Sequence, residues 1–153
     1  MLKRLFLSLA LTGAVAASAA AQERQWSLDS GDGEAYLVFG VPESDDIGIS
    51  LWCTMQSGRV KLFLPEGDPD LKVGITVRMT VTVGTRKFRY KAKTSPNEEG
   101  ATTSAETSMS ATDPLFDAMI KADRFKVKVG REEQVYPLAD SDVAGLQRVC
   151  RKP

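Results

Sequence analysis

The chain has 153 residues, with 20 basic and 20 acidic side chains and no histidine. A chain with no net charge lacks the strongly basic composition of a general nucleic-acid-binding protein, so we expect no nucleic-acid partner. The absence of histidine excludes the Ser-His-Asp triad, cysteine–histidine pairs and nearly all zinc sites.

The first residues have the pattern of a secretory signal peptide. Lys3 and Arg4 precede a short apolar run, and the small residues that follow end in an A-x-A site at Ala21. We expect cleavage after Ala21, so that 1–21 is a signal peptide and 22–153 a single secreted domain. The alternative is an uncleaved membrane anchor, although the run is short and rich in small residues. Because no later segment is apolar enough to span a membrane, the expected location is periplasmic or secreted.

The first part of the domain alternates apolar and polar residues with period two, which is typical of half-buried strands. Strands are expected at residues 25–29, 34–41, 47–55 and 60–64. The pattern puts Cys53 in the core, and the turn before Val60 is expected to bring it opposite Leu62. Trp52 lies on the polar face. It is either a contact anchor or covered by another sheet or helix, and we favour cover.

The clearest element is a hairpin over Ile75–Ala92. Apolar and polar residues alternate along its first strand, and Gly84-Thr85 fits a two-residue loop that needs positive φ at its first position. This loop fixes the register: Val83 faces Arg86, Val81 faces Phe88, Met79 faces Tyr90 and Val77 faces Ala92. A one-residue slip would bury lysines and arginines, so two independent patterns agree on one register.

The same register gathers basic side chains on the polar face of the hairpin. This basic stripe consists of Arg78, Lys87, Arg89 and Lys91, with Arg86 and Lys93 at its ends. One interpretation is an ordinary charged outer face. The other is an anion-binding face for a polyanionic glycan, lipid head groups or an acidic protein. The pair Arg78 and Lys91 places like charges opposite each other, which is mildly destabilising and favours the second interpretation.

The last third is expected to contain further strands and two short helices. A strand near 101–109 is favoured over a disordered segment within 94–112, which is rich in Ser, Thr and Ala. Asp113 and Pro114 are typical of an N-cap and a first helical residue. Strands at 125–129 and 133–138 and a final helix, capped by Asp140 or Ser141, complete the chain.

The two cysteines, Cys53 and Cys150, are expected to form a disulfide because an exported chain meets an oxidising compartment. Cys150 follows Val143 and Leu146 at helical spacing, which places it on the buried face of the last helix. The alternative is a reactive thiol or a metal ligand, for which the sequence lacks a C-x-x-C motif and any histidine.

No catalytic, metal or cofactor motif is present. P-loop, G-x-G-x-x-G, G-x-S-x-G and S-x-x-K motifs are all absent, and we expect no cofactor and no bound metal. Carboxylate pairs could support glycoside hydrolysis, and the candidates are Asp45-Asp46 and Glu98-Glu99. Adjacent acids in loops are more often solvated charges, so we do not expect an enzyme.

The signal peptide, the strand ISLWCTM, the return strand RVKLFLP and the ending YPLADSDVAGLQRVC together resemble small periplasmic proteins of Gram-negative bacteria. The ending is distantly similar to that of the invasion-associated locus B family. The resemblance covers mainly residues 47–64 and 125–150. It implies a noncatalytic envelope protein, and it assigns no functional residue.

We therefore expect a mainly β fold, an antiparallel sandwich or flattened barrel of eight or nine strands with two short helices near the C-terminus. The expected function is a noncatalytic periplasmic or secreted binding protein whose partner is an anionic envelope component or another protein. The second hypothesis is a secreted inhibitor of a hydrolase, presenting the loops 42–46 and 65–71. The third is a carboxylate-based hydrolase. The sequence leaves the ligand and the oligomeric state open.

Overall fold

The computed structural model describes residues 23–97 and 102–153. The predicted signal peptide and the pair Glu98-Glu99 lie outside these residues. Within them, one antiparallel sheet contains β1 (Gln25–Gly31), β2 (Glu34–Gly40), β3 (Ile47–Thr54), β4 (Arg59–Leu64), β5 (Thr76–Val83), β6 (Arg86–Asn97), β7 (Thr102–Ser110), β8 (Arg124–Val129) and β9 (Glu132–Pro137). Two helices, α1 (Pro114–Ile120) and α2 (Val143–Cys150), flank the last two strands along the chain.

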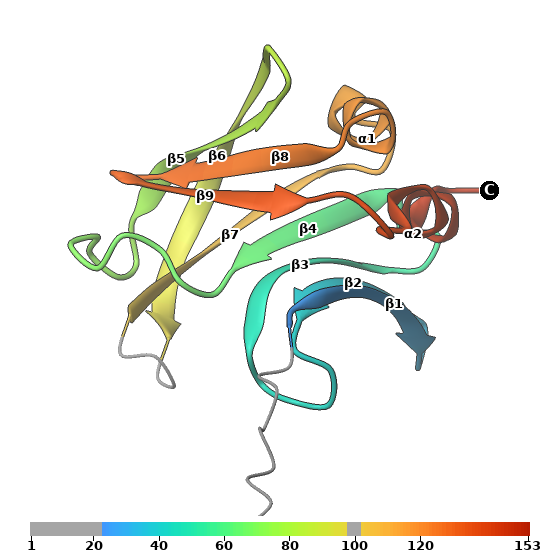
Figure 1. Cartoon of the computed structure of the whole chain (residues 1–153), viewed down its shortest axis with the longest axis horizontal. Helices are drawn as coiled ribbons and strands as arrows, with labels where there is room; N and C mark the ends of the chain where they lie inside the picture. Colours follow the sequence, from blue (N-terminus) through green and yellow to red (C-terminus); the bar gives the residue numbers. More distant parts are fainter. Residues whose placement is uncertain (1–22, 98–101) are drawn as a thin grey trace, which may run out of the picture.

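The sheet has the order β1-β2-β3-β4-β7-β6-β5-β8-β9 and curls into a half-barrel (Figure 1). The mainly β, antiparallel fold with two short helices is therefore confirmed. A single curled sheet corresponds to the flattened-barrel form of that prediction. The strand predicted near 101–109 is present as β7, which pairs with β4 and β6 in the middle of the sheet.

The central hairpin has the predicted register. Gly84 takes a φ of 57°, and Val81 pairs with Phe88 as the two-residue loop requires. Alternation therefore divides each strand between an inner face, which builds the core, and an outer face, which meets solvent. The fully buried side chains include Leu37, Leu51, Leu62, Met79, Val81, Phe116, Phe125 and Leu146.

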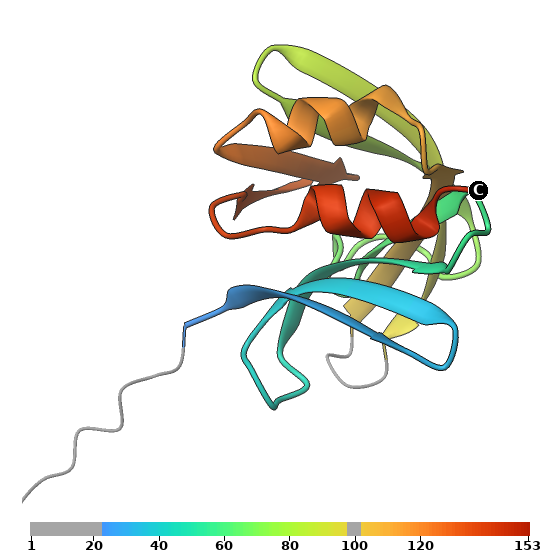
Figure 2. The same ribbon diagram turned by 90° about the vertical axis from the view of Figure 1, so that its right-hand side faces the viewer.

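Both helices lie side by side on one side of the curled sheet (Figure 2). α2 packs on β2, β3 and β4, while α1 contacts β5. Asp113 caps α1 as predicted, because its carboxylate accepts the Leu115 N–H at 2.9 Å. The cap of α2 is Asp142 rather than Asp140 or Ser141, since the Asp142 carboxylate accepts the Gly145 N–H at 2.7 Å.

The predicted disulfide is present and ties α2 to β3. Cys53 and Cys150 are bonded across 97 positions of sequence. The predicted pairing of Cys53 with Leu62 is wrong: Leu51 lies opposite Leu62, because the turn between β3 and β4 has four residues. That turn is held against the end of α2, where the Gly58 N–H donates to the Cys150 carbonyl at 2.8 Å. A shift of two residues keeps every side chain on its face, so Cys53 still points inward.

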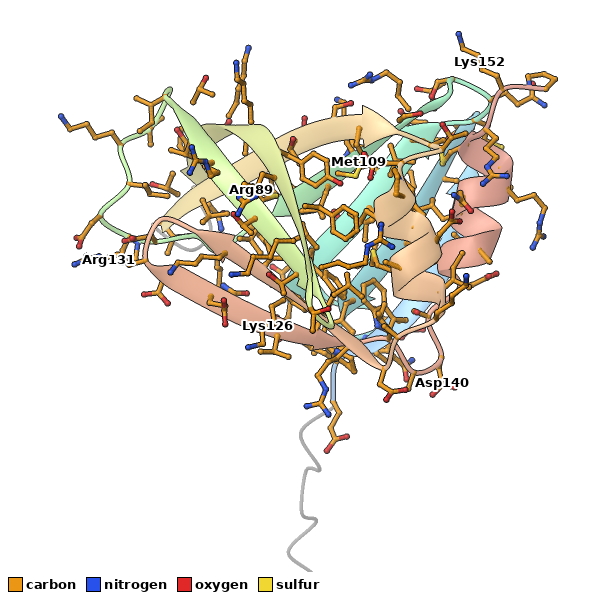
Figure 3. The ribbon with its side chains drawn as sticks, turned by 90° about the horizontal axis from the view of Figure 1, so that it is seen from above. Arg89, Met109, Lys126, Arg131, Asp140 and Lys152 are labelled. Carbon is orange, nitrogen blue, oxygen red and sulfur yellow. A yellow bond between two sulfur atoms is a disulfide. The ribbon has the colours of Figure 1, made fainter. Side chains whose placement is uncertain are left out.

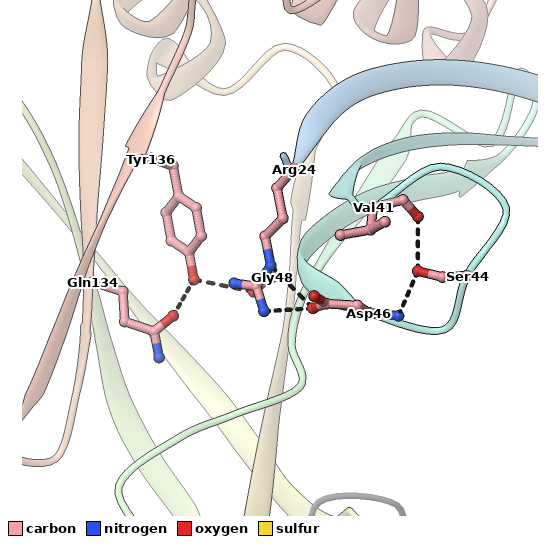
Figure 4. A network of polar contacts seen from close by, with 7 residues as sticks. All are labelled: Arg24, Val41, Ser44, Asp46, Gly48, Gln134 and Tyr136. Atoms are coloured by element: carbon pink, nitrogen blue, oxygen red, sulfur yellow. Dashed lines mark hydrogen bonds and ion pairs between the residues drawn. The ribbon is translucent and has the colours of Figure 1, made fainter. Parts of the chain in front are cut away.

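Side chains join the two edges of the sheet, β1 and β9. The Trp26 indole N–H on β1 donates to the Pro137 carbonyl on β9 at 2.6 Å. The Tyr136 hydroxyl on β9 donates to the Gly48 carbonyl on β3 at 3.1 Å (Figure 4). Arg24, which precedes β1, holds the Asp46 carboxylate of the β2–β3 loop with Nε at 3.0 Å. The half-barrel is thus closed along this seam by side chains.

No helix in the described part of the chain is long and apolar enough to cross a membrane.

Candidate functional site

Five residues of the predicted basic stripe share the outer face of the hairpin, including Lys93, which lies opposite Thr76 at its end. Arg78 on β5 and Lys87, Arg89 and Lys91 on β6 are all exposed. Arg78 lies directly opposite Lys91 in the register. The two-residue loop explains this arrangement, because it sets the parity that sends these side chains outward together.

Arg86 does not belong to this face, and its inclusion in the stripe was wrong. It pairs with Val83, whose side chain is buried on the inner side of the sheet. The Arg86 guanidinium lies over the Phe88 ring, 4.9 Å from its centroid. The physical reason is the period of two: residues 86 and 88 point to the same side of β6, so the cation stays beside a ring at the hairpin tip.

Strand β8 adds two cations that the sequence reasoning missed. β8 pairs with β5 so that Lys128 lies opposite Thr80 and Lys126 opposite Thr82. On the other side of β5, Arg89 lies opposite Thr80 and Lys87 opposite Thr82. Two short hydroxyl side chains are therefore framed by four long cationic ones, of which Arg89 and Lys126 are labelled in Figure 3. We define the basic face as Arg78, Lys87, Arg89, Lys91, Lys126 and Lys128.

The charge of the basic face is poorly compensated. Lys126 forms an ion pair with Glu133 on β9, with a separation of 3.2 Å. Within the described residues, the other five cations of the face form no ion pair with a carboxylate. The summed charge gives this side of the sheet a positive potential, which attracts anions at low ionic strength.

Two shallow hollows lie on either side of Arg78. One, of about 320 Å³, is bordered by Arg78, Thr80 and Lys128. The other, also of about 320 Å³, is bordered by Thr76, Arg78, Arg89 and Lys91. Each places a guanidinium and at least one further cation beside a threonine hydroxyl. A phosphate, sulfate or carboxylate group would find both charge and hydrogen-bond donors there.

Asp45 and Asp46, the candidates for glycoside hydrolysis that the structure describes, do not belong to the basic face. Asp46 is held by Arg24 through an ion pair of 2.5 Å at the seam, so it serves the structure of the β2–β3 loop. In the segments 23–97 and 102–153, no group of three or more cysteine and acidic side chains is placed to hold a metal ion.

Sequence reasoning also misjudged Trp52. Trp52 is half-buried, but both helices pack on the other side of the sheet, so its cover comes from neighbouring side chains of the same sheet. It stacks on Tyr36 of β2, with the ring centroids 5.9 Å apart and the planes 17° apart. Lys61 of β4 lies over the opposite side of the pair, with Nζ 4.1 Å from the Trp52 ring centroid. We call Tyr36, Trp52 and Lys61 the aromatic platform.

Comparisons with protein-family models, with curated proteins and with solved structures found no match to this chain. The resemblance to the invasion-associated locus B family therefore stays a prediction, and the functional argument rests on the geometry alone.

Proposed function

We propose that the protein is a noncatalytic binding protein of the bacterial periplasm or of the secreted fraction, and that it binds an anionic partner on its basic face. The observation that carries this proposal is the frame of four cations around Thr80 and Thr82, built from three neighbouring strands. Two further observations support the proposal: the uncompensated positive charge of the basic face and the two hollows beside Arg78. The disulfide is compatible with an oxidising compartment outside the cytoplasm.

The requirements of folding alone do not account for the excess of positive charge on the basic face. A solvated sheet face needs polar residues but does not need one sign of charge. Arg78 and Lys91 directly opposite each other weaken the hairpin slightly, since like charges at paired positions repel. A partner that supplies negative charge would turn this repulsion into attraction.

The inhibitor hypothesis requires a protruding rigid loop, and the loop after β4 does not protrude. Its central residue Asp68 is only 3% exposed. The Asp68 carboxylate accepts the backbone N–H of Arg131 at 2.8 Å and that of Asp70 at 2.9 Å. The loop 65–71 is thereby folded onto the turn between β8 and β9, which favours the basic face over this loop as the contact surface.

The test is salt-dependent binding of dextran sulfate to the purified protein, measured by calorimetry. We expect binding that weakens as salt rises, because the screening length falls from about 10 Å at 0.1 M to about 3 Å at 1 M. Arg89→Glu combined with Lys91→Glu should abolish it. The matched control is Lys121→Glu with Arg151→Glu, which makes the same change of charge at exposed positions away from the basic face.

Equal losses in the two double variants would mean that only net charge matters and would remove the basic face as a site. Absence of salt-sensitive binding to dextran sulfate, polyphosphate and anionic vesicles alike would refute the proposal as a whole. The melting temperature of the Arg89→Glu, Lys91→Glu variant should stay close to that of the unchanged protein, since changes on a solvated face usually alter stability by within about 0.5 kcal/mol.

A further inference from the structure

The aromatic platform and the basic face lie on one row of side chains across the outer side of the sheet. Tyr36 pairs with Trp52, and Trp52 with Lys61. Lys61 in turn pairs with Ser108 on β7. All of these side chains point outward, as the stacking of Tyr36 and Trp52 and the position of Lys61 over Trp52 demonstrate.

The row continues from β7 into the basic face. The paired residues of β6 and β7 include Lys93 with Glu106, and two further residues along each strand bring Lys91 opposite Ser108. The strands are still adjacent there, because the Thr107 hydroxyl donates to the Lys91 carbonyl at 2.8 Å. Lys91 then pairs with Arg78. From Trp52 to Lys91 the row crosses three strand spacings, about 14 Å.

Two acids lie beside this path. Glu34 accepts a hydrogen bond from the Tyr36 hydroxyl at the aromatic end of the row. Glu106 is bound to Lys61 at 3.5 Å and lies opposite Lys93, in the neighbouring row of the sheet. The row through Ser108 carries a hydroxyl at that strand, and the Arg59 guanidinium reaches the Ser108 hydroxyl at 3.1 Å. A ligand that follows this row meets first aromatic rings, then cations and a hydroxyl, and then the guanidinium of Arg78.

The far end of the row opens into a hollow whose wall is largely apolar, including Val38, Val41 and Pro42, with polar groups among these residues. It has a volume of about 330 Å³, at the lower end of the range of small-ligand sites, and Tyr36 forms part of its wall. Gln25, Ser27 and Asp29 of β1 and Ser44 of the β2–β3 loop line it as well. Amide, hydroxyl and carboxylate groups around an exposed ring suit a ligand with a flat apolar face and a rim of hydroxyl groups, which is the chemistry of a sugar ring.

We propose that the anionic ligand is an oligosaccharide bearing carboxylate, sulfate or phosphate groups, with a sugar ring packed against the Tyr36 end of the aromatic platform and its anions on the basic face. This inference rests on the proposed function, because it names the ligand class of the same face. Charge complementarity selects an anionic chain, and the stacked rings select a sugar over an anion without rings. The curl of the sheet selects a flexible chain over a lipid bilayer, since a flat surface cannot touch Trp52 and Arg78 together on a convex face.

The test compares four probes on the purified protein by calorimetry: dextran sulfate, neutral dextran, polyphosphate and vesicles of anionic phospholipid. We expect dextran sulfate to bind more tightly than polyphosphate at equal salt, and neutral dextran to bind weakly or not at all. Trp52→Ala should weaken dextran sulfate binding by up to about tenfold, the scale of one lost aromatic contact, and leave polyphosphate binding unchanged.

Two further variants keep the test decisive if Trp52→Ala lowers stability. Trp52→Phe keeps a ring and should retain most of the affinity for dextran sulfate. Tyr36→Ala should weaken it, because Tyr36 is 37% exposed at the other side of the stack. Ile120→Ala is the matched control, since this residue is an exposed apolar side chain of α1 outside the row. It should change the binding of no probe.

The outcomes separate this inference from the proposed function. Equal affinity for dextran sulfate and polyphosphate, unaffected by Trp52→Ala, would overturn the sugar assignment and leave anion binding standing. Tighter binding to the vesicles than to dextran sulfate would overturn it in favour of a lipid surface. Trp52-dependent binding of neutral dextran would overturn the requirement for an anion. No binding of any anionic probe would remove both proposals.

Discussion

The two halves of the outer face differ in how many of their cations have a carboxylate partner, although both are built by the same alternation of apolar and polar residues. Over β1 to β4 and the residue before them, two of three cations have carboxylate partners: Arg24 binds Asp46, and Lys61 binds Glu106 while lying over Trp52. The third, Arg59, reaches the Ser108 hydroxyl. On the basic face, built by β6, β5 and β8, five of the six cations have no carboxylate partner among the described residues. The fold requires polar residues on both surfaces, so folding alone does not account for the difference between them.

The inner faces show no such contrast. Leu37 and Leu51 of the first half and Met79 and Val81 of the second are all fully buried. What differs is how each half is held in place. The first half is tied to α2 by a disulfide, and the second is tied to its neighbouring loop by the buried carboxylate of Asp68. These ties can be broken one at a time.

The largest effect is expected from the disulfide of the first half. Cys53→Ala with Cys150→Ala should lower the free energy of unfolding by about 4–5 kcal/mol, because a cross-link over a long loop restricts the unfolded chain. Denaturant unfolding measures it, and the unchanged protein under reducing conditions should lose a similar amount. A loss below about 1 kcal/mol would mean that packing of α2 alone holds the first half.

The corresponding change in the second half is Asp68→Ala. It leaves the backbone N–H groups of Asp70 and Arg131 without their acceptor. An unsatisfied buried donor costs about 1–3 kcal/mol, so the free energy of unfolding should fall by that amount.

The matched control is Asp70→Ala. Asp70 also contacts Arg131, but its side chain is 71% exposed, so its removal should change stability by less than about 0.5 kcal/mol. Equal effects of the two substitutions in thermal or denaturant unfolding would show that the buried hydrogen bonds of Asp68 are not what anchors the loop.

Local pattern was enough to predict the central hairpin and the disulfide. The loop at Gly84 fixes the register of β5 and β6 within a few residues. Strand alternation places Cys53 on an inner face, and helical spacing places Cys150 on one. The face of Arg86 was also available from that register, since its partner Val83 is apolar. It was missed because a charge at a strand end was grouped with its neighbours rather than assigned by parity.

The remaining features depend on contacts between distant parts of the chain. Lys126 and Lys128 join the basic face only because β8 pairs with β5, and alternation within β8 does not identify its neighbour. The exposure of Trp52 depends on which side of the sheet the helices occupy. A strand pattern gives the two faces of each element, but the strand order that assembles a surface is a tertiary property.

The seam between the halves gives a prediction about pH. Burial raises the pKa of Tyr136, and the nearby Glu66 raises it further while Arg24 lowers it. The folded state therefore keeps the phenol proton at a pH where the unfolded state loses it, above about pH 10. Stability from this group is present below that pH and is lost as pH rises toward the folded pKa, with a slope of up to about 1.4 kcal/mol per pH unit.

Tyr136→Phe removes both the titration and the hydrogen bond to the Gly48 carbonyl. Near pH 8 the variant should be less stable by about 0.5–1.5 kcal/mol, the value of one hydrogen bond. The difference from the unchanged protein should shrink as pH rises above about 10, measured by denaturant unfolding at a series of pH values. A constant difference across that range would show that Tyr136 does not titrate differently on folding.

The smallest effect tests the contrast of charge itself, with one substitution made in each half. Lys91→Glu places an acid opposite Arg78 and replaces a like-charge pair with an attractive one, so the free energy of unfolding should rise by about 0.2–1 kcal/mol at low salt. Lys61→Glu places an acid beside Glu106 and removes the cation over Trp52, so stability should fall. Both changes should shrink in 1 M salt, where charges are screened within about 3 Å. The Lys91 variant should also lose affinity for dextran sulfate as it gains stability. The positive charge that repels Arg78 in the free protein is the same charge that attracts the anionic ligand. If Lys91→Glu destabilises the protein instead, the positive charge is compensated in the native fold, and the basic face is an ordinary solvated surface.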